Sequence, residues 1–280
     1  MKPIGRGHCL ISPLNSRLNL LEMSKEELKD FSHLSQFVCK VAKRRFGCKG
    51  IYFAIQDGKS AGQSVSHLHK HILPCVERPP LSERRTISME EMKEEAEEWK
   101  KAIQSFNHSL DSYNLTKEEI AHEILQQTGI NKEVRSTRCF QPLQMLHSQK
   151  SVDIVLSNNP ILLGHVLLFP KRNIKHFDHL NHEEVHDFNV AMFLVSKLLK
   201  QELKAEAVNS FMNDGANLEK DRFFVEMVPR NLYDLPQEDI YDYFERRKKP
   251  LNVLTEEEIQ ELVQRLKRPL LEIEKHFHST

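Results

Sequence analysis

Three histidines alternate with other residues in one short segment, at His67, His69 and His71. Side chains at positions i, i+2 and i+4 of a β-strand share one face, so the spacing predicts three imidazoles that point the same way. Imidazole is a common metal ligand, and near pH 7 it is also a nucleophile and a hydrogen-bonding group. The segment is therefore the first place in this sequence to look for chemistry.

Three interpretations of the histidine segment stay open from the residues alone. Buried or surface histidines without a chemical role are usual singly, but three in alternation are not expected. A metal site is disfavoured, because the outer positions of such a strand lie roughly 13 Å apart and no carboxylate or cysteine is interleaved. The third interpretation is covalent catalysis, in which one imidazole attacks while its neighbours orient it and stabilise an oxyanion.

The histidine segment lies in one of two similar stretches, whose matching residues are 157 positions apart. The matches include His8 with His165, Pro13 with Pro170, Ser24 with Asn181, and Asp57-Gly58 with Asp214-Gly215. We interpret the constant offset as a tandem duplication. The predicted fold is α+β, with an N-terminal unit (1–80), a helical connector (81–138), a C-terminal unit (139–250) and a final helix (251–280). Each unit is expected to be an antiparallel sheet with packed helices.

Short apolar or alternating runs predict the strands of the two units, at 9–11, 51–55, 66–74, 152–156 and 166–169. Ser24 and Asn181 each precede a glutamate by three residues, a capping box that starts a helix. The apolar faces of these helices are predicted at Leu28, Phe31, Leu34, Val38 and Val41, and at Val185, Phe188, Met192, Val195 and Leu199. Further helices are expected at 88–104, at 116–127, and from Thr255 towards Pro269.

The composition narrows the class of protein. Forty basic and forty acidic residues cancel, so no net field favours nucleic acid or an anionic membrane. The five cysteines form no C-x-x-C pair, and no apolar run approaches the length of a membrane span. We therefore expect a soluble intracellular protein of the cytoplasm, or of the nucleus.

Residues 56–74 closely resemble the histidine-triad superfamily, whose hallmark is His-φ-His-φ-His-φ-φ. Gln56-Asp-Gly and Ala61-Gly-Gln63, which precede the histidines, are most similar to its fragile-histidine-triad branch, the dinucleoside polyphosphate hydrolases. Residues 3–8 also resemble that branch's Pro-x-x-x-Gly-His segment. The second stretch is similar as far as Pro229-Arg230 and the residues 239–241.

The resemblance implies a role for each histidine. His69 would attack the α-phosphorus of a nucleotide and form a nucleotidyl-imidazole intermediate, which water then hydrolyses. His67 and His71 would bind phosphate oxygens and hold the nucleophile's tautomer, and His8 would complete the set. Phosphoryl chemistry of this kind depends mainly on positioning and electrostatic stabilisation.

The resemblance also implies the surroundings of the reaction. Gln56 and Gln63 match glutamines that contact the ribose or phosphate and the leaving group, and Leu10 is assigned to substrate binding with them. No tightly bound cofactor or metal is expected, and a divalent cation would arrive with the substrate. The partner is a small nucleotide, with no nucleic acid or membrane, and the two units are expected to form an intramolecular pseudo-dimer.

Several positions depart from the pattern. Counting back from Pro229, the second stretch has Arg222, Phe224 and Glu226 where the first has its three histidines, and phenylalanine cannot attack phosphorus. The first stretch has no counterpart of residues 140–159, so the first hairpin is missing from its predicted unit. Lys70 stands where an apolar residue is usual, and Cys75 where a basic one is common.

Three functions are compatible with these residues. The leading hypothesis is a hydrolase of dinucleoside polyphosphates, such as diadenosine triphosphate, that acts through His69. The alternatives are a catalytically weak nucleotide-binding or signalling protein, and a nucleoside phosphoramidase or nucleotidyl transferase of the same superfamily.

Overall fold

A computed structural model describes residues 3–48, 50–75, 87–112, 142–214, 223–235, 240 and 254–279. The chain forms two compact bodies, one of residues 1–86 and 142–280 and one of residues 87–141. The smaller body contains the helix α2 (Met89–Ser112), which confirms the helix predicted at 88–104. The helix predicted at 116–127 lies outside the described residues.

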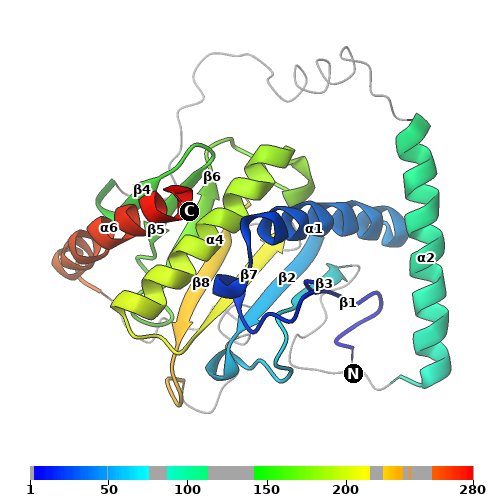
Figure 1. Cartoon of the computed structure of the whole chain (residues 1–280), viewed down its shortest axis with the longest axis horizontal. Coiled ribbons are helices and arrows are strands. Elements are labelled where there is room, and N and C mark those ends of the chain that lie inside the picture. Colours follow the sequence, from blue (N-terminus) through cyan, green and yellow to red (C-terminus); the bar gives the residue numbers. More distant parts are fainter. Residues whose placement is uncertain are drawn as a thin grey trace. The chain divides into compact units, whose positions relative to one another are not determined.

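The larger body is built on one eight-stranded sheet in the order β1-β3-β2-β7-β8-β6-β5-β4, and all its pairings are antiparallel (Figure 1). Its strands are β1 (Cys9–Ile11), β2 (Gly50–Asp57), β3 (Lys70–Cys75), β4 (Met145–Ser148), β5 (Val152–Leu156), β6 (Val166–Pro170), β7 (Ala207–Asp214) and β8 (Val225–Arg230). The predicted strands at 9–11, 51–55, 152–156 and 166–169 are thereby confirmed.

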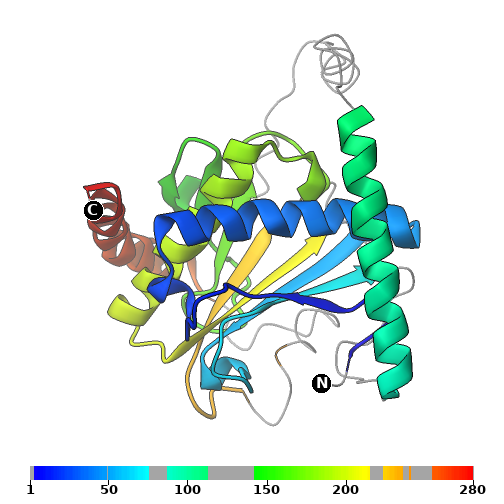
Figure 2. The ribbon, with the colours of Figure 1, turned by 45° about the vertical axis from the view of Figure 1, so that its right-hand side comes forward.

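Helices α1 (Lys25–Phe46) and α4 (His182–Glu202) lie across one face of this sheet (Figure 2). Both begin with the predicted capping box, in which the Ser24 or Asn181 side chain accepts from the third helical N–H and a glutamate reaches back. The predicted apolar faces are buried except at Leu34, which is 45% exposed. Ser35 instead faces the sheet, one position further along the helix.

The last helix, α6 (Glu256–Ser279), packs against α4 and β4. Thr255 caps it as predicted, by accepting from the Glu258 N–H. The final helix predicted within 251–280 is confirmed, and it continues past Pro269 to Ser279. The buried residues Leu266, Leu270 and Ile273 hold both sides of the proline against the core, so packing outweighs the lost backbone hydrogen bond. Short 3₁₀ turns complete the body at η1 (Leu20–Glu22), η2 (Lys59–Ala61), η3 (Pro142–Gln144) and η4 (Phe177–His179).

The two units meet where β2 pairs with β7 at the centre of the sheet. Ala54 lies opposite Phe211, and the two residues are 157 positions apart. The register is symmetrical about this pair, since Ile51 is opposite Asp214 and Asp57 is opposite Val208. Such reciprocity is the property of an interface around a two-fold axis.

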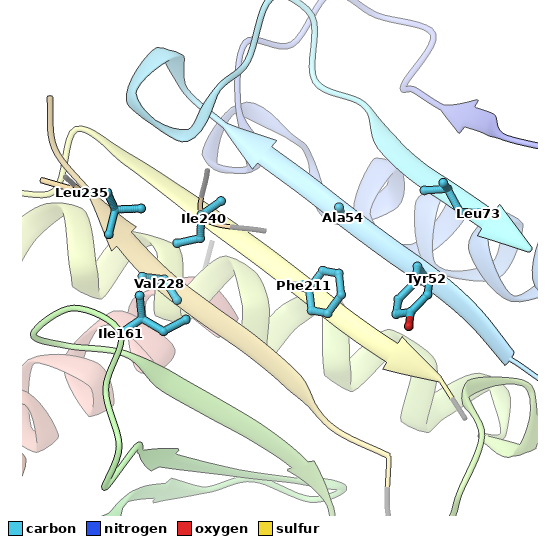
Figure 3. Packing of buried hydrophobic residues seen from close by; sticks show 8 residues of the cluster. All are labelled: Tyr52, Ala54, Leu73, Ile161, Phe211, Val228, Leu235 and Ile240. Atoms are coloured by element: carbon cyan, nitrogen blue, oxygen red, sulfur yellow. The ribbon is translucent and has the colours of Figure 1, made fainter. Parts of the chain in front are cut away.

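Apolar side chains from both units cover the sheet face that lies opposite α1 and α4 (Figure 3). Tyr52, Ala54 and Leu73 of the N-terminal unit belong to the same buried cluster as Phe211 and Val228 of the C-terminal unit. The Tyr52 and Phe211 rings stack with centroids 5.7 Å apart. The junction is therefore a continuous core and not a polar contact between separate domains.

Among the described residues, no helix combines the length and the apolar character needed to cross a bilayer.

Candidate functional site

The three histidines do not all lie on the strand that was predicted for them. β3 begins at Lys70, so only His71 is a strand residue, and the prediction of a strand from residue 66 was wrong. The pairings of β3 with both neighbours end at Lys70, opposite Ile11 at the end of β1 and opposite Ile55 of β2. The preceding residues are held instead by the segment before α1. The Leu68 N–H donates to the Arg17 carbonyl, and the His67 ring contacts the Pro13 carbonyl at 2.9 Å.

His8 and His71 form a hydrogen-bonded pair, which determines the tautomer of each ring when both are neutral. His8 Nδ1 accepts from the Ile4 backbone N–H at 3.1 Å, so a neutral His8 carries its proton on Nε2. That Nε2 lies 2.9 Å from His71 Nδ1 and therefore donates to it. A neutral His71 in turn carries its proton on Nε2.

His69 is held in the opposite tautomer. Its Nδ1 lies 2.8 Å from the His67 backbone carbonyl, which can only accept, so Nδ1 carries the proton. The Nε2 atom of His69 consequently has the free lone pair. The His69 and His71 rings meet edge to face with centroids 4.9 Å apart. A lone pair on one ring thus lies beside an N–H donor on the next, which is the pairing that a nucleophile and an oxyanion donor require.

Two of the predicted substrate-binding residues lie beside the histidines. Leu10 is opposite His71 in the β1–β3 pairing and half-buried, so it shares a sheet face with that ring. Gln56 lies near the end of β2 and is 9% exposed. The structure brings both to the histidine face of the sheet, and their role in substrate binding stays a prediction.

Gln63 belongs to the loop of residues 58–69, which joins β2 to β3, and its amide is engaged there. Its Oε1 accepts from the Gly58 N–H at 2.8 Å, and its Nε2 donates to the Leu18 carbonyl at 3.0 Å. Gly62, the next residue back, has a left-handed φ of 89°, and a Cβ there would lie 2.9 Å from Gln56 Nε2. The loop therefore lies against Gln56 at Gly62, while the Gln63 amide is held within the loop and by the segment before α1.

Lys70, between His69 and His71, points to the other face of the sheet. Its side chain is 1% exposed, Nζ donates to Ser35 Oγ at 2.9 Å, and the ammonium lies 4.5 Å from the Phe31 ring centroid. Burial lowers the pKa of Lys70 to about 7. The lysine is therefore part of the core beneath the histidines and not one of their ligand-facing neighbours.

The corresponding face of the C-terminal unit repeats the scaffold without counterparts of His69 and His71. The Ile161 N–H donates to His165 Nδ1, as Ile4 does to His8. Glu226 pairs with Leu167 in the sheet where His71 pairs with Leu10, so the offset between the two strands is 155 and not 157. Phe224 packs at 5.4 Å on the Phe169 ring, at the position equivalent to His69. Arg222 lies outside the described residues.

One group of described side chains has metal-ligand types, formed by Cys39, Asp178 and Asp214. The Lys43 ammonium already lies 2.7 Å from Asp214 and contacts Asp178, so a cation occupies the centre of the group. Burial would lower the pKa of Lys43, but Asp214 and its neighbours raise it overall. Burial also raises the pKa of the Cys39 thiol well above its usual value, which disfavours the thiolate that a metal needs. The arrangement is therefore a buried ion pair.

Sequence reasoning missed the residues by which one unit supports the other. Lys200 of α4 donates to Asp57 at 2.8 Å, and Asn209 of β7 donates to the Ala61 carbonyl at 3.0 Å. The sequence did contain a signal for the first contact, because Lys43 and Asp214 are exactly 157 positions from Lys200 and Asp57. No pattern pointed to Asn209, because the repeat has a tyrosine at the matching position.

Comparisons with known proteins follow the same division into two stretches. A family model described as the HIT domain matches residues 1–78 and 140–221, together more than half of the chain. The bis(5'-adenosyl)-triphosphatase of Dictyostelium discoideum is 36% identical over 108 residues, which are 35% of this chain and 72% of that protein. The bis(5'-adenosyl)-triphosphatase of Saccharomyces cerevisiae is 44% identical over 75 residues, 26% of this chain and only 36% of that protein.

Solved structures extend the likeness of fold to both units. A uridylyltransferase structure has a TM-score of 0.61 at 14% identity, over 95% of this chain and 75% of that chain. The structure of an ADP-glucose phosphorylase from Arabidopsis thaliana with bound ADP-glucose has a TM-score of 0.54 at 14% identity, over 92% of this chain and 72% of that one. At this identity the likeness concerns the fold alone.

Proposed function

Because the chain belongs to the HIT domain family, we propose that it hydrolyses dinucleoside polyphosphates, with His69 as the covalent nucleophile. The relatives named bis(5'-adenosyl)-triphosphatase support this substrate class, and diadenosine triphosphate is the substrate we place first. No tightly bound cofactor enters the proposal, and a divalent cation would be bound by the phosphates of the substrate.

The observation that carries the proposal is the hydrogen bond between His69 Nδ1 and the His67 carbonyl. In the neutral ring it leaves the lone pair on Nε2, which would be the attacking atom. In the first step a P–N bond forms between Nε2 and the α-phosphorus, and the P–O bond to the departing nucleotide breaks. The departing group leaves as a polyphosphate oxyanion, so it needs no proton from the protein.

His71 and His8 would stabilise the charge that develops in this step. The hydrogen bonds from Ile4 to His8 and from His8 to His71 place the proton of a neutral His71 on Nε2. This N–H would donate to a phosphate oxygen. A fixed donor of this kind in a poorly solvated site lowers the barrier, because it needs no reorganisation as the oxyanion forms. In the second step water attacks the same phosphorus, the P–N bond breaks, and His69 regains its neutral form.

We assign a supporting role to the C-terminal unit, as the second half of an intramolecular pseudo-dimer. The symmetrical β2–β7 register and the reciprocal pairs Lys43–Asp214 and Lys200–Asp57 support this assignment. With Phe224 in the place of the nucleophile, one chain would contain one working site. The boundaries 1–80, 81–138, 139–250 and 251–280 remain our proposed division of the chain.

A substrate panel tests the proposed function. Purified protein is incubated with diadenosine triphosphate, diadenosine tetraphosphate and an adenosine phosphoramidate, and the products are separated by chromatography. We expect the two polyphosphates to be cleaved to AMP and a second nucleotide, and the phosphoramidate to be turned over far more slowly. The variant Phe224→Ala is the matched control and should retain the wild-type rate.

The other outcomes are distinct. Preferred turnover of the phosphoramidate would assign the chain to the phosphoramidases. Binding of the polyphosphates without turnover would make it a nucleotide-binding protein. Either result would overturn the proposal.

A further inference from the structure

The loop that joins β2 to β3 is built against the C-terminal unit. Gly58 has a φ of 113°, and a Cβ there would lie 2.8 Å from the Ala207 Cβ of β7. Ser60 Oγ donates to the carboxylate of Glu206. Because these contacts come from residues just before and at the start of β7, the loop rests on the neighbouring unit and not only on its own.

The most buried of these contacts is made by Asn209. Its Nδ2 donates to the Ala61 carbonyl at 3.0 Å, and the residue is 1% exposed. Its Oδ1 accepts from Arg230 Nη1 at 2.7 Å, so both ends of the amide are used and its orientation is fixed. Arg230 is itself clamped by Asp234, which accepts from Nε and from Nη2 at 2.9 Å. A bidentate guanidinium–carboxylate pair of this kind has little freedom to move.

This chain of contacts does not follow the symmetry of the interface. The counterpart of Asn209 at the offset of 157 is Tyr52, and the counterpart of Arg230 in the β3–β8 correspondence is Cys75. Neither residue supplies an amide or a guanidinium. The Lys–Asp pairs therefore join the two units symmetrically. The hydrogen bonds from Arg230 to Asn209 and from Asn209 to Ala61 join the C-terminal unit to the loop beside the histidines and have no symmetrical counterpart among the described residues.

The loop includes Gln63 and lies against Gln56, the two glutamines that the family resemblance assigns to the substrate. Ala61 is followed by Gly62, which lies against Gln56, and by Gln63, which closes the loop onto Gly58. A shift of the Ala61 carbonyl would move both neighbours, because two peptide units leave few soft dihedrals to absorb it. A loop end held by a buried hydrogen bond is thereby fixed relative to His69 and His71.

We propose that Asn209 and Arg230 are positioning residues for the site of the N-terminal unit: Arg230 orients Asn209, and Asn209 holds the Ala61 carbonyl so that Gln56 and Gln63 are preorganised for the substrate. This inference rests on the proposed function of that site. It gives the C-terminal unit, which lacks a nucleophile, a specific part in the reaction of its neighbour.

The variant Asn209→Asp separates this role from simple structural support. A carboxylate still accepts from Arg230, but it cannot donate to Ala61 and repels the carbonyl oxygen. We expect amide hydrogen exchange in the loop 58–68 to rise by about tenfold, as the loss of a buried hydrogen bond predicts, while exchange in α4 stays unchanged. With diadenosine triphosphate, kcat should fall by about tenfold or more, because preorganisation acts on the transition state. KM should change by less than threefold in either direction.

Matched variants complete the experiment. Arg230→Lys keeps the charge but loses the planar fork, and should raise loop exchange in the same peptide by a smaller factor. Asn159→Asp, at an exposed position, is the control for the amide-to-acid change and should alter neither readout. If Asn209→Asp does not fold, the amide exchange of the loop in Arg230→Lys is the measurement that tests the inference.

The readouts distinguish the two proposals. Loop exchange is measured without substrate, so it tests the positioning contact even if the wild-type protein cleaves no dinucleotide. Unchanged loop exchange in folded Asn209→Asp would overturn the inference. If that variant does not fold, unchanged loop exchange in Arg230→Lys would overturn it. So would raised exchange combined with wild-type kcat.

Discussion

The Lys43 ammonium of α1 lies 2.7 Å from the carboxylate of Asp214 at the end of β7, and the contact recurs with the units exchanged. Lys200 of α4 lies 2.8 Å from Asp57 at the end of β2. Both aspartates are fully buried. Each also accepts a backbone N–H from the 3₁₀ turn of its own unit, Leu20 for Asp57 and Phe177 for Asp214. The same buried lysine–aspartate ion pair therefore occurs twice at the junction, once in each direction between the units.

Removal of one partner should destabilise the larger body strongly. We expect Lys43→Met to lower the free energy of unfolding by about 3–5 kcal/mol, because the buried Asp214 would be left beside the half-buried Asp178 without their shared cation. Urea denaturation followed by circular dichroism measures the change. Arg268→Gln, which breaks the exposed pair with Glu272, is the control and should cost less than about 1 kcal/mol. Equal losses in the two variants would contradict a structural role for the buried pair.

Lys70 predicts an unusual dependence of stability on pH. Its pKa of about 7 in the folded state lies below the ordinary lysine value of 10.5, which we take for the unfolded chain. Between these values the unfolded state binds more protons, so the free energy of unfolding should rise with pH, by at most about 1.4 kcal/mol per unit from this group. Below pH 7 both states are protonated and the full cost of burying the ammonium remains.

The variant Lys70→Met should remove this dependence and stabilise the protein at pH 6.5, because the buried ammonium has Ser35 as its hydrogen-bond partner and otherwise lies against the Phe31 and Phe53 rings. Denaturant midpoints at pH 6.5 and 9 give the measurement. Lys150→Met, which changes an exposed lysine, serves as the control. If wild type and Lys70→Met change in parallel between the two pH values, the buried lysine is not the cause.

Much of the fold could be predicted from local patterns, because capping boxes and apolar runs act within a few residues. Ser24 and Asn181 start their helices as expected. The start of β3 could not be predicted, since it depends on where the pairings with β1 and β2 end. For the same reason His67 and His69 lie before the strand, although their alternation suggested otherwise. The site histidines were identifiable from their spacing, whereas Asn209 became visible only through a contact 148 residues away in sequence.

The N-terminal unit should depend on its neighbour for stability. A fragment of residues 1–110 would lose the β7 partner along all of β2 and the Lys200 charge that compensates Asp57. It would also expose Tyr52, Ala54 and Leu73, which belong to the shared apolar cluster. We expect this fragment to aggregate, and the full chain to be a monomer by light scattering. A soluble, cooperatively folded and active fragment would refute the pseudo-dimer.

Metal analysis gives an independent check of the site chemistry. The purified protein should hold no stoichiometric zinc, because the Lys43 ammonium fills the centre of the Cys39 and aspartate group and the histidine rings bond to one another and to carbonyls. Dialysis against a chelator should leave the fold unchanged. One equivalent of zinc retained after dialysis would contradict this assignment.

The most direct measurement is a single-turnover reaction with enzyme in excess over diadenosine triphosphate. The reaction is quenched in alkali, where a phosphorus–nitrogen bond to histidine survives, and the protein is digested for mass spectrometry. The account predicts one nucleotidyl group on the peptide that contains His69, with no adduct and a loss of turnover of about a thousandfold or more in His69→Asn. Turnover that persists within about tenfold in His69→Asn, or a nucleotidyl group on another residue of the wild type, would contradict it.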